Sequence, residues 1–447
     1  MNKKKTVLEL AFVMLFLCSA RIAVSQTPAA TANPSFVAIE TKYVVVNSID
    51  NGAAYLNKHF QKSGDLTPII MTYVDNDGSV SICSADKYSK AIYIYEYTKD
   101  LVHIKTMQFQ TPFNKFGAFT KDNDGNYYIF SAEDVPEGAH NQNNMALVKY
   151  NSEGRQIAIF NSPAKTTDGF YGIKSPFATG SCRMEISGDW IAVYFAREMF
   201  IAEDGLNHQA SYGFMLNKNN LERIPNNTMP YVSHSFNQYI LPIDNGFVFV
   251  DQGDSYPRGF CFTRIQNGRE NKKITPFNFK KGKTYQNTFS QLGGLVKTPN
   301  GYLFAGTYER DPAVTSEQND SRNLFVLTFD DELNNISEPV WITNYRYKNK
   351  ENAANAKIIA LNSGRYLLMW ELIYSWSYRS TYMTIIDEKG KRLKPIKEIG
   401  RIHLNINDTL GYNRTTGNVY WAVNNGSFEI IIYTFNPDKP IKIKKSS

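Results

Sequence analysis

Seven times along this chain, a short turn that carries glycine is followed at once by a run rich in aromatic and β-branched residues. The turns recur on average roughly every 56 residues, near the ~40–50-residue period of repeat proteins in which each copy is one small sheet. Glycine suits such turns because it lacks a Cβ atom, and aromatic and β-branched side chains favour strands. Seven copies of one β unit are therefore predicted. The turn glycines are Gly78, Gly125, Gly188, Gly246, Gly301, Gly364 and Gly417.

Each copy is expected to hold four strands. A short strand precedes the turn, the run after the turn is a second strand, and a second hairpin follows a loop of variable length. A sheet with apolar residues on both faces must pack against its neighbours, and closing the copies into a ring removes the open ends. The runs after the turns are SVSICSAD from Ser79, NYYIFSAED from Asn126, WIAVYFARE from Trp190, FVFVDQGD from Phe247, YLFAGTYER from Tyr302, RYLLMWEL from Arg365 and NVYWAVNN from Asn418.

This pattern resembles a seven-bladed β-propeller over about residues 60–447, which implies an all-β fold of four-stranded antiparallel blades. No subfamily is indicated, because the chain has no Gly-His…Trp-Asp pair, no kelch-type double glycine in each repeat and no Asp-box. The ring has two candidate closing strands. One is the segment from Lys42 to Asn47, and the other is an outer strand of the seventh repeat from Pro440 to Lys445.

The N-terminus has the pattern of a secretory signal peptide. Three lysines are followed by an apolar stretch from Thr6 to Ala20, too short to span a membrane, and small residues precede Gln26. Cleavage after Ser25 is predicted, and a lipid anchor at Cys18 is disfavoured because Leu17 precedes it. We therefore expect a signal peptide (1–25), a flexible leader (26–35), one propeller domain (36–447), a secreted or periplasmic location and a monomer.

Charge and cysteine content narrow the class of partner. After residue 25 the chain keeps 45 basic and 41 acidic side chains, without the clustered basic stripe of a nucleic-acid-binding protein. Its three cysteines, Cys83, Cys182 and Cys261, lie far apart without a CxxC pair, so they are interpreted as small buried hydrophobic residues. No cofactor and no membrane span are predicted, and whether a structural or catalytic metal ion binds is left open.

Unusual polar residues fall in loops that the resemblance places on one face. In propellers, the loop entering each blade and the loop joining its second and third strands open on the face where ligands usually sit. The candidate catalytic residues are His208, His234, Tyr256 and Arg258. The candidate binding residues are Asp204, Asn207, Gln209, Gln238, Asp251, Asp254, Gln291, Trp376 and Tyr378.

These residue types suit the chemistry of acidic sugars. A histidine can donate or accept a proton, Tyr256 can act as its partner, and Arg258 can hold a carboxylate or sulfate. Trp376 and Tyr378 are candidates to stack on a sugar ring. The alternative is that the side chains brace loops, an interpretation favoured for Gln238 and Gln291 because they recur at one repeat position.

The leading interpretation is an exported propeller that recognises an extracellular polysaccharide through its loop face. Both neutral and anionic polysaccharides are considered. Whether it also cleaves the polysaccharide, as a lyase or a glycosidase, is left open. The second interpretation is a non-catalytic interaction or adhesion module that binds a protein of the cell envelope.

Overall fold

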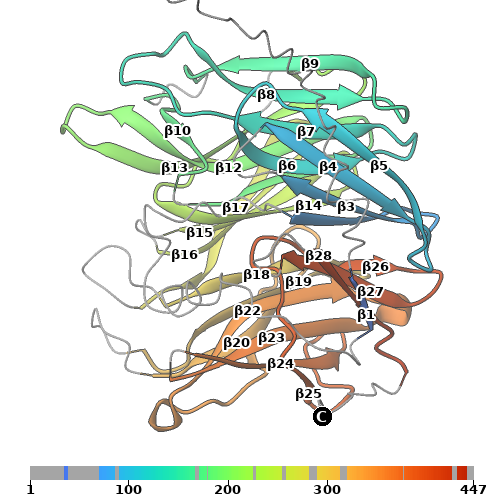
Figure 1. Ribbon diagram of the computed structural model, residues 1–447. Coiled ribbons are helices and arrows are strands. Elements are labelled where there is room, and N and C mark those ends of the chain that lie inside the picture. The colour runs from blue at the N-terminus through green and yellow to red at the C-terminus, as the bar shows by residue number, and fades with distance from the viewer. Residues whose placement is uncertain are drawn as a thin grey trace, which may run out of the picture.

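The computed structural model describes residues 35–38, 70–85, 90–166, 171–178, 180–224, 228–253, 258–280, 289–312, 320–375, 377–424 and 430–439. These residues form seven four-stranded sheets arranged in a ring (Figure 1), which makes the protein an all-β seven-bladed propeller. The predicted fold class is confirmed. Within the described ranges, no helix has the length and apolar character needed to cross a membrane.

Five blades are up-and-down sheets whose strands follow one another in chain order. The first strand of each blade contacts the first strands of its neighbours, so these strands line the central channel. From innermost to outermost, the strands are β2 (Ile70–Val74), β3 (Val80–Ala85), β4 (Ala91–Tyr97) and β5 (His103–Gln110) in blade 1; β6 (Lys115–Lys121), β7 (Tyr127–Ala132), β8 (Asn143–Tyr150) and β9 (Gln156–Pro163) in blade 2; β14 (Ser235–Ile243), β15 (Gly246–Gly253), β16 (Gly259–Gln266) and β17 (Arg269–Asn278) in blade 4; β18 (Gln291–Thr298), β19 (Gly301–Glu309), β20 (Arg322–Phe329) and β21 (Val340–Trp341) in blade 5; and β22 (Glu351–Ala360), β23 (Tyr366–Tyr374), β24 (Ser377–Ile386) and β25 (Lys397–Gly400) in blade 6. Two 3-10 helices, η2 (Tyr347–Asn349) and η3 (Asn362–Gly364), flank β22.

Blade 3 departs from the predicted pattern. Its strands are β11 (Cys182–Ser187), β12 (Trp190–Ile201) and β13 (Asn207–Asn217), and its fourth strand is β10 (Ser175–Pro176), which pairs with the far end of β12. The expected outer strand is reduced, among the described residues, to one bridge between Leu216 and Arg223. Residues 225–227, which follow, lie outside the described residues.

Blade 7 closes the ring with an N-terminal strand. It contains β26 (Gly411–Asn413), β27 (Asn418–Asn424) and β28 (Ile430–Phe435), and β1 (Ser35–Ala38) pairs with β28 in parallel. In Figure 1 the blue β1 lies beside the red strands of this blade. Both closing segments considered from the sequence, 42–47 and 440–445, lie outside the described residues.

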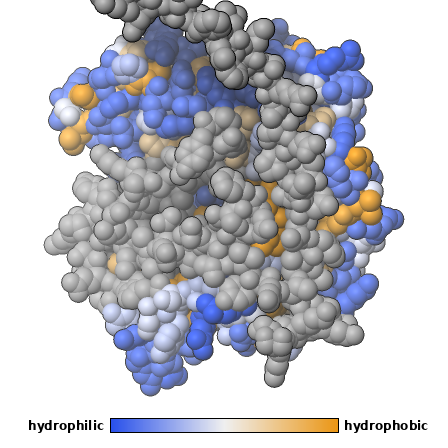
Figure 2. Space-filling view, in the orientation of Figure 1, coloured by the Kyte–Doolittle hydropathy of each residue, from blue (hydrophilic) through white to orange (hydrophobic). Residues whose placement is uncertain are grey.

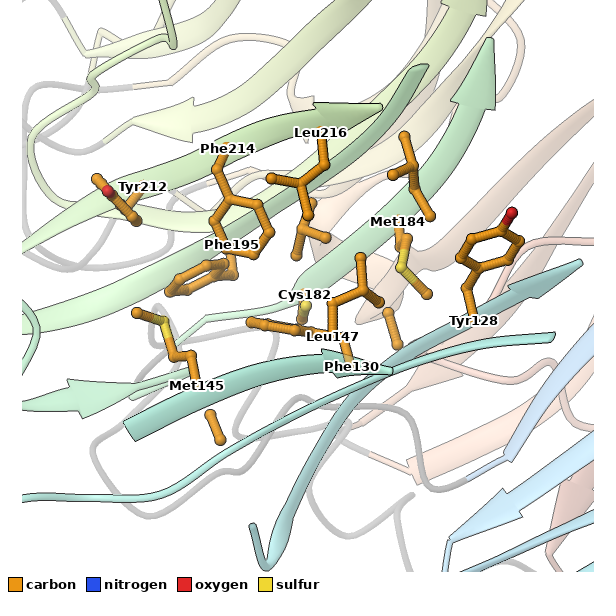
Figure 3. Packing of buried hydrophobic residues seen from close by; sticks show 14 of the residues in the cluster. Tyr128, Phe130, Met145, Leu147, Cys182, Met184, Phe195, Tyr212, Phe214 and Leu216 are labelled. Atoms are coloured by element: carbon orange, nitrogen blue, oxygen red, sulfur yellow. The ribbon is translucent and has the colours of Figure 1, made fainter. Parts of the chain in front are cut away.

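The core is divided among the boundaries between blades. Seven clusters of buried hydrophobic residues are each shared by two neighbouring blades, including one shared by blades 7 and 1. Figure 3 shows the cluster between blades 2 and 3, where Phe130 and Leu147 face Phe195 and Phe214. Each fully buried side chain of this size stabilises the fold by roughly 1.5–3 kcal/mol. The ring is therefore held by packing between sheets.

The cysteines behave as predicted. Cys83, Cys182 and Cys261 are free and buried, in β3, β11 and β16. Trp370, on β23, is fully buried. Over the described part of the surface seen in Figure 2, hydrophilic residues predominate and hydrophobic ones occupy smaller areas.

Candidate functional site

One end of the propeller collects the candidate residues. In an up-and-down sheet, the loop entering the first strand and the loop joining strands two and three lie at the same end. We call this end the loop face. His208 lies at the start of β13, after the second-to-third connection of blade 3, and His234 directly precedes β14 of blade 4. The two residues thus come from neighbouring blades on the loop face.

The two histidines lie close together. Their ring centroids are 6.3 Å apart with an angle of 74° between the planes. His208 Nε2 lies 2.8 Å from a carboxylate oxygen of Asp204, and 32% of the His208 side chain is exposed. His234 has a left-handed backbone (φ 51°), its N–H donates to the Gln209 carbonyl oxygen at 2.8 Å, and its Nδ1 lies 2.8 Å from Ser233 Oγ. The pair is held by the backbone of both blades, and both residues are partly exposed.

Arg258 adds a positive charge beside this pair. It directly precedes β16, it is 2% exposed, and the Phe279 N–H donates to its carbonyl oxygen at 2.9 Å. Burial lowers the pKa of His234, and the charges of His208 and Arg258 lower it further. The imidazole of His234 is therefore biased toward its neutral form until a negative charge enters.

Asp251 lies deeper, in a network of hydroxyl groups. Its carboxylate is fully buried and accepts hydrogen bonds from Tyr194 Oη at 2.6 Å and from Ser235 Oγ at 2.5 Å. Burial raises the pKa of Asp251 to about 7, against the lowering effect of these hydrogen bonds. Asp251 therefore binds the inner part of blades 3 and 4 together and does not open on the loop face.

Two further predicted residues support the loops. Asn207 Nδ2 donates to the Met199 carbonyl oxygen at 2.8 Å and to Glu137 at 3.3 Å, which ties blade 3 to blade 2. Gln209 is 9% exposed, and its Nε2 is buried without a hydrogen bond to any residue that the structure describes. Gln209 follows His208 in β13, and its carbonyl oxygen accepts from the His234 N–H, so its backbone links the two histidines.

Gln238 and Gln291 belong to a polar belt, a set of hydrogen bonds that joins the inner strands and entry loops of successive blades. Gln238 is fully buried, and its Oε1 accepts from the Ser181 N–H at 3.0 Å. Gln291 Oε1 accepts from the Asn355 N–H at 2.9 Å. Gln238 and Gln291 thus brace neighbouring blades, which is the alternative role considered for them from the sequence. The belt joins Ser181 to Gln238, Gln252 to Ser290, Gln291 to Asn355, Asn355 to Leu404 and Asn405 to Ile70.

A segment of blade 7 crosses the central channel. Residues 404–408 lead into β26, and three strands of other blades hold them: Lys357 Nζ donates to the Ile406 carbonyl oxygen at 3.2 Å, Arg183 Nη1 to that of Asn407 at 2.8 Å, and the Thr72 N–H to Asp408 at 2.7 Å. Arg183 is in blade 3, on the far side of the ring. We call residues 404–408 the channel segment.

The channel holds charged residues that the sequence interpretation missed. Burial and the charge of Arg183 lower the pKa of Lys357 to about 7. Burial, with the negative charge of Asp408, raises the pKa of Glu185 to about 8, and burial raises that of Asp408 to about 6. Arg183 and Glu185 alternate with the core residues Cys182 and Met184 on an innermost strand, and this alternation was the available signal.

The aromatic residues of blade 6 are arranged differently from the expectation. Tyr378 is 6% exposed, its ring lies 3.8 Å from that of His403, and its hydroxyl lies 2.9 Å from Thr381 Oγ1. This packing covers the ring, so Tyr378 offers no open face for stacking on a sugar. Tyr374 and Tyr347 are the exposed tyrosines there, at 48% and 49%.

Three predicted residues, Asp254, Tyr256 and Trp376, lie outside the described residues. Within the described ranges, no group of three or more His, Cys, Asp or Glu side chains is placed to hold a metal ion.

Comparisons with known proteins identify no family for this chain. No protein-family model matches the chain, and no curated protein matches it. Similar solved structures include hydrazine synthase of Kuenenia stuttgartiensis (11% identity, 81% of this chain and 94% of that chain, TM-score 0.47) and a protein of unknown function from Dyadobacter fermentans (10%, 71% and 94%, TM-score 0.42). Another is lignostilbene dioxygenase of Pseudomonas brassicacearum (8%, 75% and 73%, TM-score 0.41). Likeness at this level carries no information on activity.

Proposed function

We propose that the loop face binds an acidic extracellular polysaccharide at the entrance between blades 3 and 4. The observation that carries the proposal is the approach of His208 and His234 with Arg258 beside them. His208 and Arg258 both disfavour a positive charge on His234, so a carboxylate or sulfate bound beside His234 would favour its protonated form and pair with it. The N-terminal signal pattern supports an extracellular ligand.

Cleavage by β-elimination is a second candidate, favoured by the lowered pKa of His234. A neutral imidazole can remove the proton from the carbon beside a uronate carboxylate while Arg258 balances the charge. The electron pair left on carbon forms a double bond, the adjacent carbon–oxygen bond breaks, and the leaving oxygen takes a proton from His208 or Tyr256.

The test is binding and turnover of a polysaccharide panel by the chain that lacks residues 1–25. Polygalacturonate, alginate and chondroitin sulfate are compared with dextran by calorimetry, and ultraviolet absorbance of unsaturated ends reports elimination. Reducing ends without such absorbance would indicate hydrolysis. We expect binding to acidic chains only, with affinity lost in His234→Ala and Arg258→Ala.

Matched variants separate a binding role from a structural one. Arg258→Lys keeps the charge at a buried position, His103→Ala changes a histidine on the outer strand β5, and Arg155→Ala changes an exposed arginine of the β8–β9 turn. If the Ala variants melt at a lower temperature yet bind normally, the residues only brace the loops. If no acidic polysaccharide binds, the envelope-protein alternative is favoured.

A further inference from the structure

We infer that the loop face of blade 6 is a second contact surface for the same acidic polysaccharide, at which exposed tyrosines stack on sugar rings and unpaired cations bind the acidic groups. The inference rests on the proposed function, because it extends the same ligand across the same face. We call this surface the blade 6 platform. It consists of Arg346, Tyr347, Lys348, Lys350, Tyr374 and Arg379, all exposed.

The platform is built from two connected turns. The helix η2 lies in the loop entering blade 6, where the Asn349 N–H donates to the Arg346 carbonyl oxygen at 2.9 Å and the Lys350 N–H to that of Tyr347 at 2.8 Å. The turn between β23 and β24 is tied to it, because the Ser375 N–H donates to the Lys350 carbonyl oxygen at 3.0 Å. Both tyrosines are thus presented by a fixed backbone.

The charges of the platform are not neutralised within the described structure. None of Arg346, Lys348, Lys350 and Arg379 forms an ion pair or a side-chain hydrogen bond with a described residue. By contrast, Lys115 is paired with Asp134 and Arg365 with Asp438. The nearby Glu351 accepts a hydrogen bond from Asn349 at 3.3 Å. Glu398, which accepts a hydrogen bond from Tyr382 at 3.3 Å, is a second carboxylate in this part of blade 6. Four cations against these two carboxylates leave the surface positive, which favours a polyanion as the occupant.

The combination of groups favours an acidic polysaccharide among polyanions. Tyrosine offers a flat apolar ring with a polar tip, which suits the apolar face and hydroxyl groups of a sugar. Arginine binds carboxylate or sulfate through two parallel hydrogen bonds, and lysine adds charge without demanding one geometry. A carboxylate-bearing or sulfated sugar chain meets both needs at once.

Arg310 lies between the platform and the histidine entrance. It is exposed at the loop face of blade 5, and its Nη1 donates to Asn344 Oδ1, at 3.3 Å, in the loop that enters blade 6. Exposed positive groups of the loop face therefore extend from Arg310 in blade 5 to the platform in blade 6, and the histidine entrance lies one blade further along the ring. An extended chain that occupies both ends would bind more tightly than a short one, because its second contact is intramolecular.

The experiment compares chain lengths. Long polygalacturonate and its trimer are titrated into wild type, Tyr347→Ala/Tyr374→Ala and Lys348→Glu/Lys350→Glu. The control, Lys389→Glu/Lys391→Glu, reverses two exposed lysines of the β24–β25 turn of the same blade, on the opposite face. We expect both platform variants to lose about tenfold in affinity for the long chain, with trimer binding and melting temperature unchanged. The control should bind as wild type does.

Each other outcome has a distinct meaning. Equal affinity of wild type and platform variants for the long chain overturns the inference and leaves the proposed function standing. Loss in the platform variants together with normal binding by His234→Ala supports the platform and overturns the histidine entrance. Single-stranded DNA is the remaining comparison. If it binds more tightly than polygalacturonate, and only its binding is weakened in the platform variants, the inference is overturned in favour of a nucleic acid.

Discussion

Arg183, on the innermost strand of blade 3, donates a hydrogen bond across the central channel to the carbonyl oxygen of Asn407, which enters blade 7. The bond is 2.8 Å long, and it joins two blades that do not touch around the ring. It is one of three contacts that hold the channel segment, together with those from Lys357 and Thr72. The channel segment thus links opposite sides of the propeller in addition to the contacts between neighbouring blades.

Arg183→Met should destabilise the protein by about 1.5–3 kcal/mol, because a partly buried carbonyl loses a charged donor. Urea unfolding measures the loss. Arg155→Met is the control: that side chain is 77% exposed and pairs with Glu153, so its replacement should change stability by less than about 0.5 kcal/mol. Equal effects of the two substitutions would show that the cross-channel bond does not contribute.

Asp251 should make stability depend on pH. Its pKa is raised to about 7 in the folded protein from an ordinary value of 3.8, so the unfolded state releases its proton first. Its stabilising contribution is therefore complete below pH 3.8 and is lost as pH rises through 7. Asp251→Asn removes this titration. The free energy of unfolding of wild type, measured relative to Asp251→Asn, should fall between pH 4 and 8, and parallel profiles would contradict the assignment.

Gly301→Ala should cost more than Gly364→Ala, although both are turn glycines with positive φ, of 146° and 64°. A Cβ atom on Gly301 would lie 1.9 Å from the Phe329 carbonyl oxygen, whereas nothing lies within 4 Å of one on Gly364. We expect a loss of about 1 kcal/mol at Gly364 from backbone strain alone and roughly 3 kcal/mol at Gly301, where strain and a backbone clash add. Thermal and urea unfolding of both variants would reveal the difference, and a smaller loss at Gly301 would refute it.

An acidic ligand should bind more tightly as pH falls through the pKa of His234. Burial, His208 and Arg258 lower this pKa in the free protein, and a bound anion would raise it, so binding takes up a proton. Affinity for polygalacturonate, measured by calorimetry between pH 5 and 8, should decrease with rising pH, by up to tenfold for each unit of pKa change on binding. His234→Gln should remove that dependence, and His103→Ala should keep it.

The sequence predicted the blades well because their signals are local. A glycine turn between a short strand and an aromatic strand is a property of about ten adjacent residues, and it correctly located β3, β7, β12, β15, β19, β23 and β27. The resemblance to a propeller also placed the loops that contain His208 and His234 on one face, and the structure has the two residues close together there. The distance of 6.3 Å between their ring centroids requires only that blades 3 and 4, which follow each other in the sequence, pack side by side.

The tertiary structure decided which residues are exposed and which are joined across the ring. Tyr378 is buried because the ring of His403, from the loop that leads to blade 7, packs against it, whereas Tyr374 is exposed at the end of β23. A contact between residues 25 positions apart has no local pattern in the sequence. Arg183 and Asn407 are separated by 224 positions, so their bond exists only once the ring has closed. The sequence alone determined the repeating unit and the number of its copies, because strand and turn preferences act over short distances. Only the tertiary structure shows the closure by β1, the channel segment and the blade 6 platform. These features depend on residues that are distant in the sequence and meet only when the blades pack into a ring.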